Sequence, residues 1–291
     1  MTATTYDSRG SSLPRTMLNK VPEVTFFFWV IKILCTTVGE SAADYLNDNL
    51  GFGLTNTTYV TGALLAVLLV WQFRLRRYVP GVYWSAVVVI SVFGTLITDN
   101  LTDGHNVPLT TTTPIFAAIL AIVFAVWYGF ERTLSIHTII TTRREAFYWL
   151  AILFTFALGT AAGDLVAEKA DLGYGVSILI FGGVIALIAL LHYGLKVNAV
   201  LTFWLAYIMT RPLGASIGDF LSQNDPKYGG LGLGTTATSY LFLACILALV
   251  AYLTLTKRDQ TPPELIERDE RIATTHRHAH APPLSPRPDE A

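Results

Sequence analysis

Eight long, nearly uncharged apolar segments limit most strongly what this chain can fold into. Hydrophobic residues make up 52% of its 291 residues and charged residues only 14%, whereas a soluble domain carries nearer a quarter charged residues. Each segment approaches the roughly 20 residues that a helix needs to cross the hydrocarbon core. In lipid only helices or closed barrels satisfy their backbone groups, and these runs lack the alternation of barrel strands. The sequence therefore predicts an all-α membrane protein with eight transmembrane helices, at about residues 23–46, 54–73, 80–101, 110–130, 146–168, 174–194, 198–222 and 235–256.

Lysine and arginine are distributed unequally between the two sets of connections. One side carries Arg9, Arg15, Lys20, Arg74, Arg76, Arg77, Arg132, Arg143, Arg144, Lys196, Lys257 and Arg258. The other side has only Lys169 and Lys227, together with several acids. Because basic connections remain in the cytoplasm, we expect both termini on the cytoplasmic side.

A fourfold internal repeat organises the segments. The pattern W-x9-G-x4-D-x3-[DEQ] occurs four times, at offsets of 55, 65 and 55 residues. Its members are Trp29, Trp84, Trp149 and Trp204; Gly39, Gly94, Gly159 and Gly214; Asp44, Asp99, Asp164 and Asp219; and Asp48, Asp103, Glu168 and Gln223. Self-similarity of this kind indicates duplication of one supersecondary unit. We divide the chain into a cytoplasmic tail at 1–22, repeats at 23–78, 79–143, 144–197 and 198–257, and a disordered cytoplasmic tail at 258–291.

Each unit crosses the membrane twice, so all four units point the same way. This predicts parallel repeats with pseudo-symmetry about the membrane normal, unlike the inverted repeats of many transporters. The four aspartates then lie at one depth, towards the external side. In each unit the Trp and Asp are about 22 Å apart along the helix. We interpret the tryptophans as interfacial anchors and the glycines as sites of close helix packing.

The intramembrane acids are the candidate functional residues. A charge inside the bilayer costs several kcal/mol, so such residues usually face the bundle interior or a wet cavity. We predict that Asp44, Asp99, Asp164 and Asp219 bind an ion or carry protons, with Glu40 as an additional acid found only in the first unit. The outer acids Asp48, Asp103 and Glu168 are secondary candidates, since acids four residues apart share one helix face and repel. Wet outer acids and acids that cap loops are the structural alternatives.

Two cations lie deeper in the apolar segments. Lys32 and Arg211 are the predicted counter-charges, each eight residues before an acid of its own helix. That spacing is too long for pairing within one helix, so we expect pairing across helices, for example of Lys32 with an aspartate of another unit. Snorkelling of Lys32 towards the cytoplasm is the alternative. Pro212 invites a broken helix with free carbonyls beside the acids.

The fourfold Trp/Gly/Asp unit, with the segment from Leu18 to Leu46, resembles a bacterial family of membrane-anchored proteins built from four tandem two-helix repeats of unknown function. The resemblance covers about residues 18–257, without the two tails. It implies eight spans and a bacterial origin, and hence a multi-pass protein of the cytoplasmic (inner) membrane. It implies no settled chemistry. Gln223 and Glu40 depart from strict repetition and make the four units unequal.

The leading functional hypothesis is a transporter or exporter of small cations, with a divalent metal such as Mn²⁺ favoured and proton coupling considered. Oxygen-donor acids suit hard cations, and neither a cysteine pair nor a histidine cluster lies in the spans. The alternatives are a non-transporting structural or sensory membrane protein and a proton-gated channel or anion carrier that uses Lys32 and Arg211. An enzyme is not expected, because the sequence has no H-E-x-x-H, G-x-S-x-G or P-loop.

We expect no cofactor beyond a divalent cation as substrate. The expected partners are the lipid bilayer and a small cation or proton, with homo-oligomers allowed and no nucleic acid. Cys35 and Cys245 are isolated, so we interpret them as packing residues. The cluster of His276, His278 and His280 is either a metal-gathering tail or a solvated low-complexity end.

Overall fold

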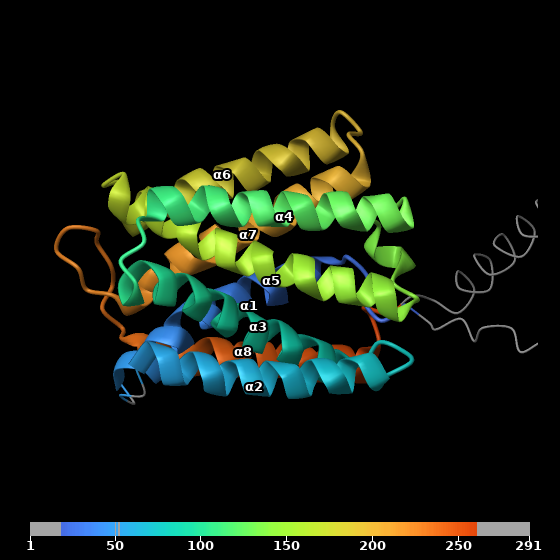
Figure 1. Ribbon diagram of the computed structural model, residues 1–291, viewed down its shortest axis with the longest axis horizontal. Helices are drawn as coiled ribbons and strands as arrows, with labels where there is room; N and C mark the ends of the chain where they lie inside the picture. Colours follow the sequence, from blue (N-terminus) through green and yellow to red (C-terminus); the bar gives the residue numbers. More distant parts are fainter. Residues whose placement is uncertain (1–18, 50, 52, 261–291) are drawn as a thin grey trace, which may run out of the picture.

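The computed structural model describes residues 19–49, 51 and 53–260, without the side chains of Asp48 and Asn49. That part of the chain forms eight long antiparallel helices and no strands (Figure 1). Their bounds are α1 Phe26–Asp44, α2 Gly53–Arg74, α3 Pro80–Asp99, α4 Leu109–Glu131, α5 Thr142–Asp164, α6 Gly173–Tyr193, α7 Ala199–Ser222 and α8 Thr235–Thr256. The protein is thus an all-α membrane protein of eight spans, as predicted. The predicted cluster of three tail histidines lies outside the described residues.

The helices form an inner and an outer layer. For the most apolar stretch of each helix, 56 to 67% of the residues are buried in the odd-numbered helices α1, α3, α5 and α7. The even-numbered helices bury only 17 to 22% and leave large apolar side chains such as Val67, Leu179 and Leu247 exposed. In a membrane these outer faces contact lipid tails, while the inner helices can carry polar groups that lipid would not accept.

The repeat glycines close the four inner helices into a ring. Each glycine lies against the neighbouring inner helix at the residue seven positions after that helix's repeat tryptophan. The four contacts are Gly39 with Ser91, Gly94 with Phe156, Gly159 with Arg211, and Gly214 with Thr36. A β-carbon at any of the four would overlap its partner, so the glycines permit a helix approach that no other residue allows. Since the last contact joins the fourth unit to the first, the pseudo-fourfold arrangement is complete.

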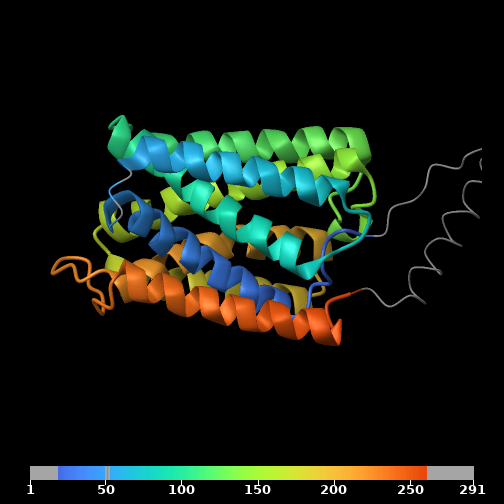
Figure 2. The same ribbon diagram turned by 90° about the horizontal axis from the view of Figure 1, so that it is seen from below.

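The outer helices also pack against the neighbouring unit in the same order around the ring. Helix α2 packs on α3, α4 on α5, α6 on α7, and α8 returns to α1. Figure 2 shows α8, in orange, running along α1, in blue. Each outer helix therefore packs against the inner helix of the next unit. The result is four parallel two-helix repeats around one axis.

Helix starts follow ordinary capping chemistry. The side chains of Thr25, Thr141 and Asn198 accept hydrogen bonds from backbone N–H groups in the first turns of α1, α5 and α7. Helix α3 begins with Pro80, whose missing N–H would have no partner there. These residues determine where each inner helix begins.

The prediction that the repeat tryptophans are interfacial anchors is wrong for at least three of them. Trp84, Trp149 and Trp204 are buried, and only Trp29 is half-buried. Trp84 donates to the Tyr78 hydroxyl at 3.1 Å, and Trp204 donates to the carbonyl of Leu134 at 2.9 Å. Aromatic neighbours surround all three rings, and these acceptors satisfy the indole N–H groups of Trp84 and Trp204 inside the bundle.

The two ends of the bundle differ in charge. The basic end comprises the connections 75–79, 132–141 and 194–198 and the segments that lead to both termini. The acidic end comprises the described residues 45–49 and 51 and the connections 100–108, 165–172 and 223–234. Figures 1 and 2 both show the first and the last described segments at the same end of the bundle. This agrees with the even number of spans.

The first and the last described segments both pack against the basic end of the bundle. Lys20 is buried and forms a 2.6 Å ion pair with Glu145, to which Gln72 also donates at 3.2 Å. Asp259, which the sequence analysis placed in the tail, is buried and accepts a 2.5 Å hydrogen bond from Tyr78. The fold therefore extends a few residues beyond the helices at each terminus.

The docking of Asp259 should depend on pH. Burial raises the pKa of the Asp259 carboxyl, although the Tyr78 hydrogen bond opposes this. A raised pKa means that the folded protein favours the neutral acid, so this contribution is largest at low pH and is lost as the pH rises through the folded-state pKa. We expect the melting temperature of wild type to fall relative to that of Asp259→Asn between pH 4 and pH 8, measured in detergent. A difference that stays constant over this range would contradict the assignment.

Candidate functional site

The inner helices share a buried stripe that faces the pseudo-fourfold axis. It consists of every fourth residue, at positions −1, +3, +7, +11 and +15 from each repeat tryptophan. Successive levels of this axial stripe are about 6 Å apart along a helix. From the basic end to the acidic end they hold Phe28, Tyr83, Tyr148 and Phe203; Lys32, Val87, Ile152 and Tyr207; Thr36, Ser91, Phe156 and Arg211; Glu40, Thr95, Thr160 and Ala215; and Asp44, Asp99, Asp164 and Asp219. All are buried except Phe203, Asp44, Asp99 and Asp164, which are half-buried.

Arg211 joins the four units at the centre of the axial stripe. Its guanidinium is 0% exposed and donates to Glu40 Oε2 at 3.0 Å and to Thr160 Oγ1 at 2.7 Å. It also donates to the Thr95 hydroxyl and, at 2.9 Å, to the carbonyl of Thr36. One arginine from the fourth unit thus binds the other three inner helices.

Three of these partners occupy one position of the repeat. Glu40, Thr95 and Thr160 each follow directly after a repeat glycine, and the fourth unit has Ala215 there. Because the glycines bring the helices close, the next residue of each helix points at the axis. Glu40 supplies the charge that a buried guanidinium requires, and the two hydroxyls supply neutral acceptors.

Three carboxyl groups meet beside Arg211, towards the acidic end. Oxygens of Glu40, Asp164 and Asp219 all lie within 4.8 Å of one another. Glu40 is 6% and Asp219 9% exposed, and Asp164 is half-buried. Divalent cations bind carboxylate oxygens at about 2.0–2.6 Å, so oxygens at this separation can share one ion after a small adjustment. This group, called the carboxylate cluster below, is the candidate metal site.

The other two repeat aspartates lie around the carboxylate cluster. Asp99 is within electrostatic range of Glu40, Asp164 and Asp44, and Asp219 is within range of Asp44. Asp44 accepts a 3.3 Å hydrogen bond from Gln223, the residue that replaces the outer acid in the fourth unit. The structure thus brings all four aspartates to one interior region, with only two of them in the cluster itself.

Two of the outer acids, Asp103 and Glu168, do not join the cluster, for a local reason. In the first three units the aspartate is the last α-helical residue and a π-helical turn follows, at Tyr45–Asn49, Asn100–Gly104 and Leu165–Lys169. A π turn is wider than an α turn, so residues four apart no longer share a face. Asp103 and Glu168 are exposed, and Glu168 accepts a 3.3 Å hydrogen bond from Tyr174. The side chain of Asp48 lies outside the described residues.

The predicted pairing of Lys32 with an aspartate is wrong, and so is snorkelling. Lys32 is 0% exposed, with Nζ 4.3 Å from the ring centroid of Phe156 and 4.1 Å from that of Tyr207. It has no hydrogen-bond partner. Arg211 takes the nearest acid instead, because its longer side chain starts one level closer to Glu40. The predicted break at Pro212 is also absent: α7 continues through it from Ala199 to Ser222.

Two hydroxyl ligands of Arg211, Thr95 and Thr160, were not predicted from the sequence. Both resemble ordinary small packing residues in apolar segments. The signal that could have found them is the alignment of the four units, in which Glu40, Thr95 and Thr160 share one position. The hydrogen bond of 2.5 Å between the Tyr83 and Tyr148 hydroxyls at the level nearest the basic end was not predicted either.

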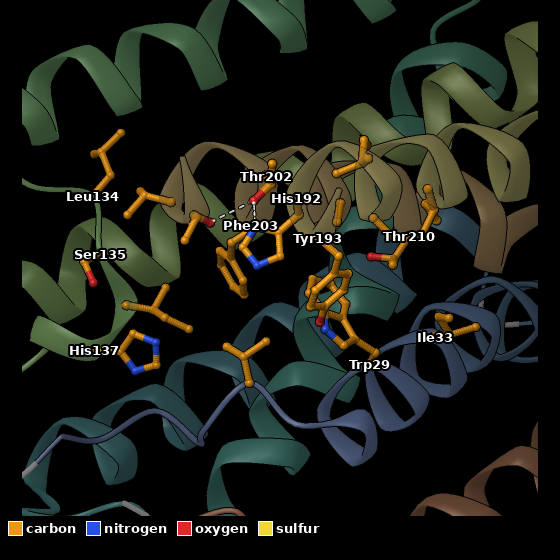
Figure 3. A pocket seen from close by; sticks show the side chains of 18 residues that line it. Trp29, Ile33, Leu134, Ser135, His137, His192, Tyr193, Thr202, Phe203 and Thr210 are labelled. Carbon is orange, nitrogen blue, oxygen red and sulfur yellow. Dashed lines mark hydrogen bonds between the residues drawn. The ribbon is translucent and has the colours of Figure 1, made fainter. Parts of the chain in front are cut away.

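A separate cavity of about 420 Å³ lies between α1, α6, α7 and the connection before α5 (Figure 3). Its lining is mainly apolar and includes Trp29, Ile33 and Phe203. Its polar groups include His137 and the pair of Thr202 and His192, joined by a 3.0 Å hydrogen bond. None of the described residues that line it is acidic, so this cavity is not the candidate cation site.

Comparison with known proteins identifies the repeat. The model of the family described as Repeat of Unknown Function (DUF347) matches residues 27–78, 82–133, 147–198 and 202–259. Searches of curated proteins and of solved structures gave no match. The matches cover most of the chain, and each contains one Trp/Gly/Asp unit. The chain therefore belongs to this family of tandem membrane repeats.

Proposed function

We propose that the protein transports small divalent cations, such as Mn²⁺, across the cytoplasmic membrane of a bacterium, with both termini in the cytoplasm. The observation that carries the proposal is the meeting of Glu40, Asp164 and Asp219 within 4.8 Å in the interior of the bundle. Acids in a membrane interior are costly, and a bound cation is the simplest way to offset that cost. Oxygen donors alone suit hard cations rather than soft ones.

The charge of the cluster fits a divalent ion. When ionised, the three carboxylates of the cluster carry three negative charges, and Arg211 compensates one of them. Two charges remain, which one divalent cation neutralises. Exposed acids at the acidic end, such as Glu168 and Asp171, would raise the local cation concentration at the entrance.

Arg211 serves as a tethered counter-ion in this proposal. In the described structure its guanidinium holds Glu40 at 3.0 Å. An arriving cation competes for the same carboxylate, so Glu40 exchanges one positive partner for another. The buried charge stays balanced throughout, which lowers the barrier for ion movement through a low-dielectric interior.

Substitution of the cluster acids tests the proposal. Asp164→Asn and Asp219→Asn each remove a charged ligand and should lower Mn²⁺ flux into liposomes at least about tenfold, as expected for a lost ligand of a metal site. Flux can be followed with a trapped metal-sensitive dye. The matched control is Asp103→Asn, an exposed acid of the same region, which should stay within about twofold of wild type. Equal flux in all four proteins would exclude the carboxylate cluster as the ion site.

A structural role is the second candidate, favoured by the bonds of Arg211 to three other helices. In that case the protein would transport nothing, and Asp164→Asn would change only its stability. Wild-type liposomes that show no flux above protein-free liposomes for Mn²⁺, Mg²⁺ or Ca²⁺ would favour this reading.

A further inference from the structure

Lys32 is a buried amine that the carboxylate cluster does not use. Its amine is 0% exposed and has no hydrogen-bond partner. The Phe156 ring lies 4.3 Å from Lys32 Nζ and 5.6 Å from Arg211 Cζ, so both basic side chains contact the same ring. An ammonium and a guanidinium this close repel each other in a medium of low dielectric constant.

Titratable groups lie on both sides of Lys32 along the axial stripe, although the Tyr207 hydroxyl, like the Lys32 amine, has no hydrogen-bond partner. The titratable or charged groups around it are Arg211 and Tyr207 on α7 and Cys35 on α1. Tyr83 on α3 and Tyr148 on α5 follow towards the basic end, joined by their 2.5 Å hydrogen bond. Hydroxyl groups both accept and donate protons, whereas the remaining stripe residues of these two levels, such as Val87 and Ile152, do neither.

We propose that Lys32 is a proton-binding site, linked through Arg211 to cation occupancy of the carboxylate cluster and through buried tyrosine hydroxyls to the basic end. The inference rests on the proposed function and names its coupling ion as the proton. When a divalent cation takes Glu40, the guanidinium loses its carboxylate and its charge is no longer compensated next to Lys32. The ammonium then gives up a proton.

The proton transfer balances without any further reactant. One N–H bond of the Lys32 ammonium breaks and its electron pair stays on the nitrogen. The proton passes to an oxygen on the path to the basic end, and each hydroxyl that accepts a proton releases its own to the next. The net result is one proton delivered to water at the basic end for each cation bound at the cluster.

Titration calorimetry of the purified full chain with MnCl₂ tests this. Measurements in two buffers of different ionisation enthalpy give the protons released per bound Mn²⁺. We expect Lys32→Met to release about one proton fewer than wild type. The apparent Mn²⁺ affinity should also depend less on pH in Lys32→Met, with a rise per pH unit that is smaller than that of wild type by a factor of about ten, the value for one linked proton. The control Lys196→Met, at an exposed lysine, should match wild type. Equal proton release in Lys32→Met and wild type would overturn the inference while leaving the carboxylate cluster intact as a metal site.

A kinetic measurement covers the case in which Lys32→Met does not fold. In Tyr148→Phe the buried hydroxyl is lost, so proton release after rapid mixing with MnCl₂ should slow at least about tenfold, whereas Tyr240→Phe at an exposed position should not change it. An unchanged rate in Tyr148→Phe would reject the path. Failure of wild type to bind Mn²⁺ at all would instead overturn the proposed function, and this inference with it.

Discussion

Replacement of Arg211 by methionine is expected to destabilise the folded protein by about 3–5 kcal/mol, the usual consequence of removing one partner of a buried ion pair. Glu40 would remain buried with an uncompensated charge, and Thr95 and Thr160 would lose their donor. Thermal unfolding in detergent, followed by circular dichroism, measures the effect.

Two further variants make this result specific. Adding Glu40→Gln to Arg211→Met removes the stranded charge and should restore most of the lost stability, because two neutral groups of similar shape can replace a buried pair. Arg74→Met at an exposed position should change stability by no more than about 0.5 kcal/mol. If Arg211→Met unfolded at the wild-type temperature, the guanidinium would not hold the inner helices together.

Gly214→Leu is expected to prevent closure of the inner ring. A β-carbon at Gly214 would lie 2.5 Å from Thr36 Cβ and 3.1 Å from the backbone nitrogen of Thr37, so α7 and α1 would have to separate. The smaller change Gly214→Ala should already destabilise the protein by about 1–3 kcal/mol through overpacking. For Gly214→Leu we expect no monodisperse folded protein on size-exclusion chromatography.

The matched control lies in an outer helix. At Gly182 in α6 an added β-carbon meets nothing within 4 Å, so Gly182→Ala should be as stable as wild type or more stable by up to about 1 kcal/mol. A Gly214→Leu protein that eluted and melted like Gly182→Ala would refute the closed ring.

The two predictions address one property of the molecule. The glycines set the distance between inner helices, and that distance decides which side chains reach the axis. Glu40 and the two threonines meet Arg211 because each stands directly after a glycine that touches its neighbour. The ring and the candidate site therefore depend on the same contacts.

Most of the architecture could be predicted from the sequence. Lipid permits few structures, so eight apolar segments determine eight helices. The four copies of Trp, Gly and Asp at constant spacing determine four parallel units. Close packing at Gly39, Gly94, Gly159 and Gly214 also follows from the residue type, since small residues mark helix contacts in membranes.

Other features needed tertiary information because they depend on neighbours that are distant in sequence. Trp84 is buried since Tyr78 and other aromatic rings surround it, and the sequence shows only an amphipathic ring near a helix start. Asp103 is exposed because a π turn follows Asp99, and no residue type in the sequence predicts that turn. Lys32 contacts two aromatic rings because Glu40 is paired with Arg211 and not with Lys32.

Hydrophobicity and spacing along each segment were enough to predict the eight helices of the described residues, their alternating direction and the position of the aspartate along each inner helix. The order of the ring and the rotation of each helix follow only from the folded bundle. These bring Glu40, Asp164 and Asp219 together and leave Asp44 and Asp99 beside them. The physical reason is that helix rotation is set by packing between side chains of different units, and periodicity within one unit carries no information about its neighbour.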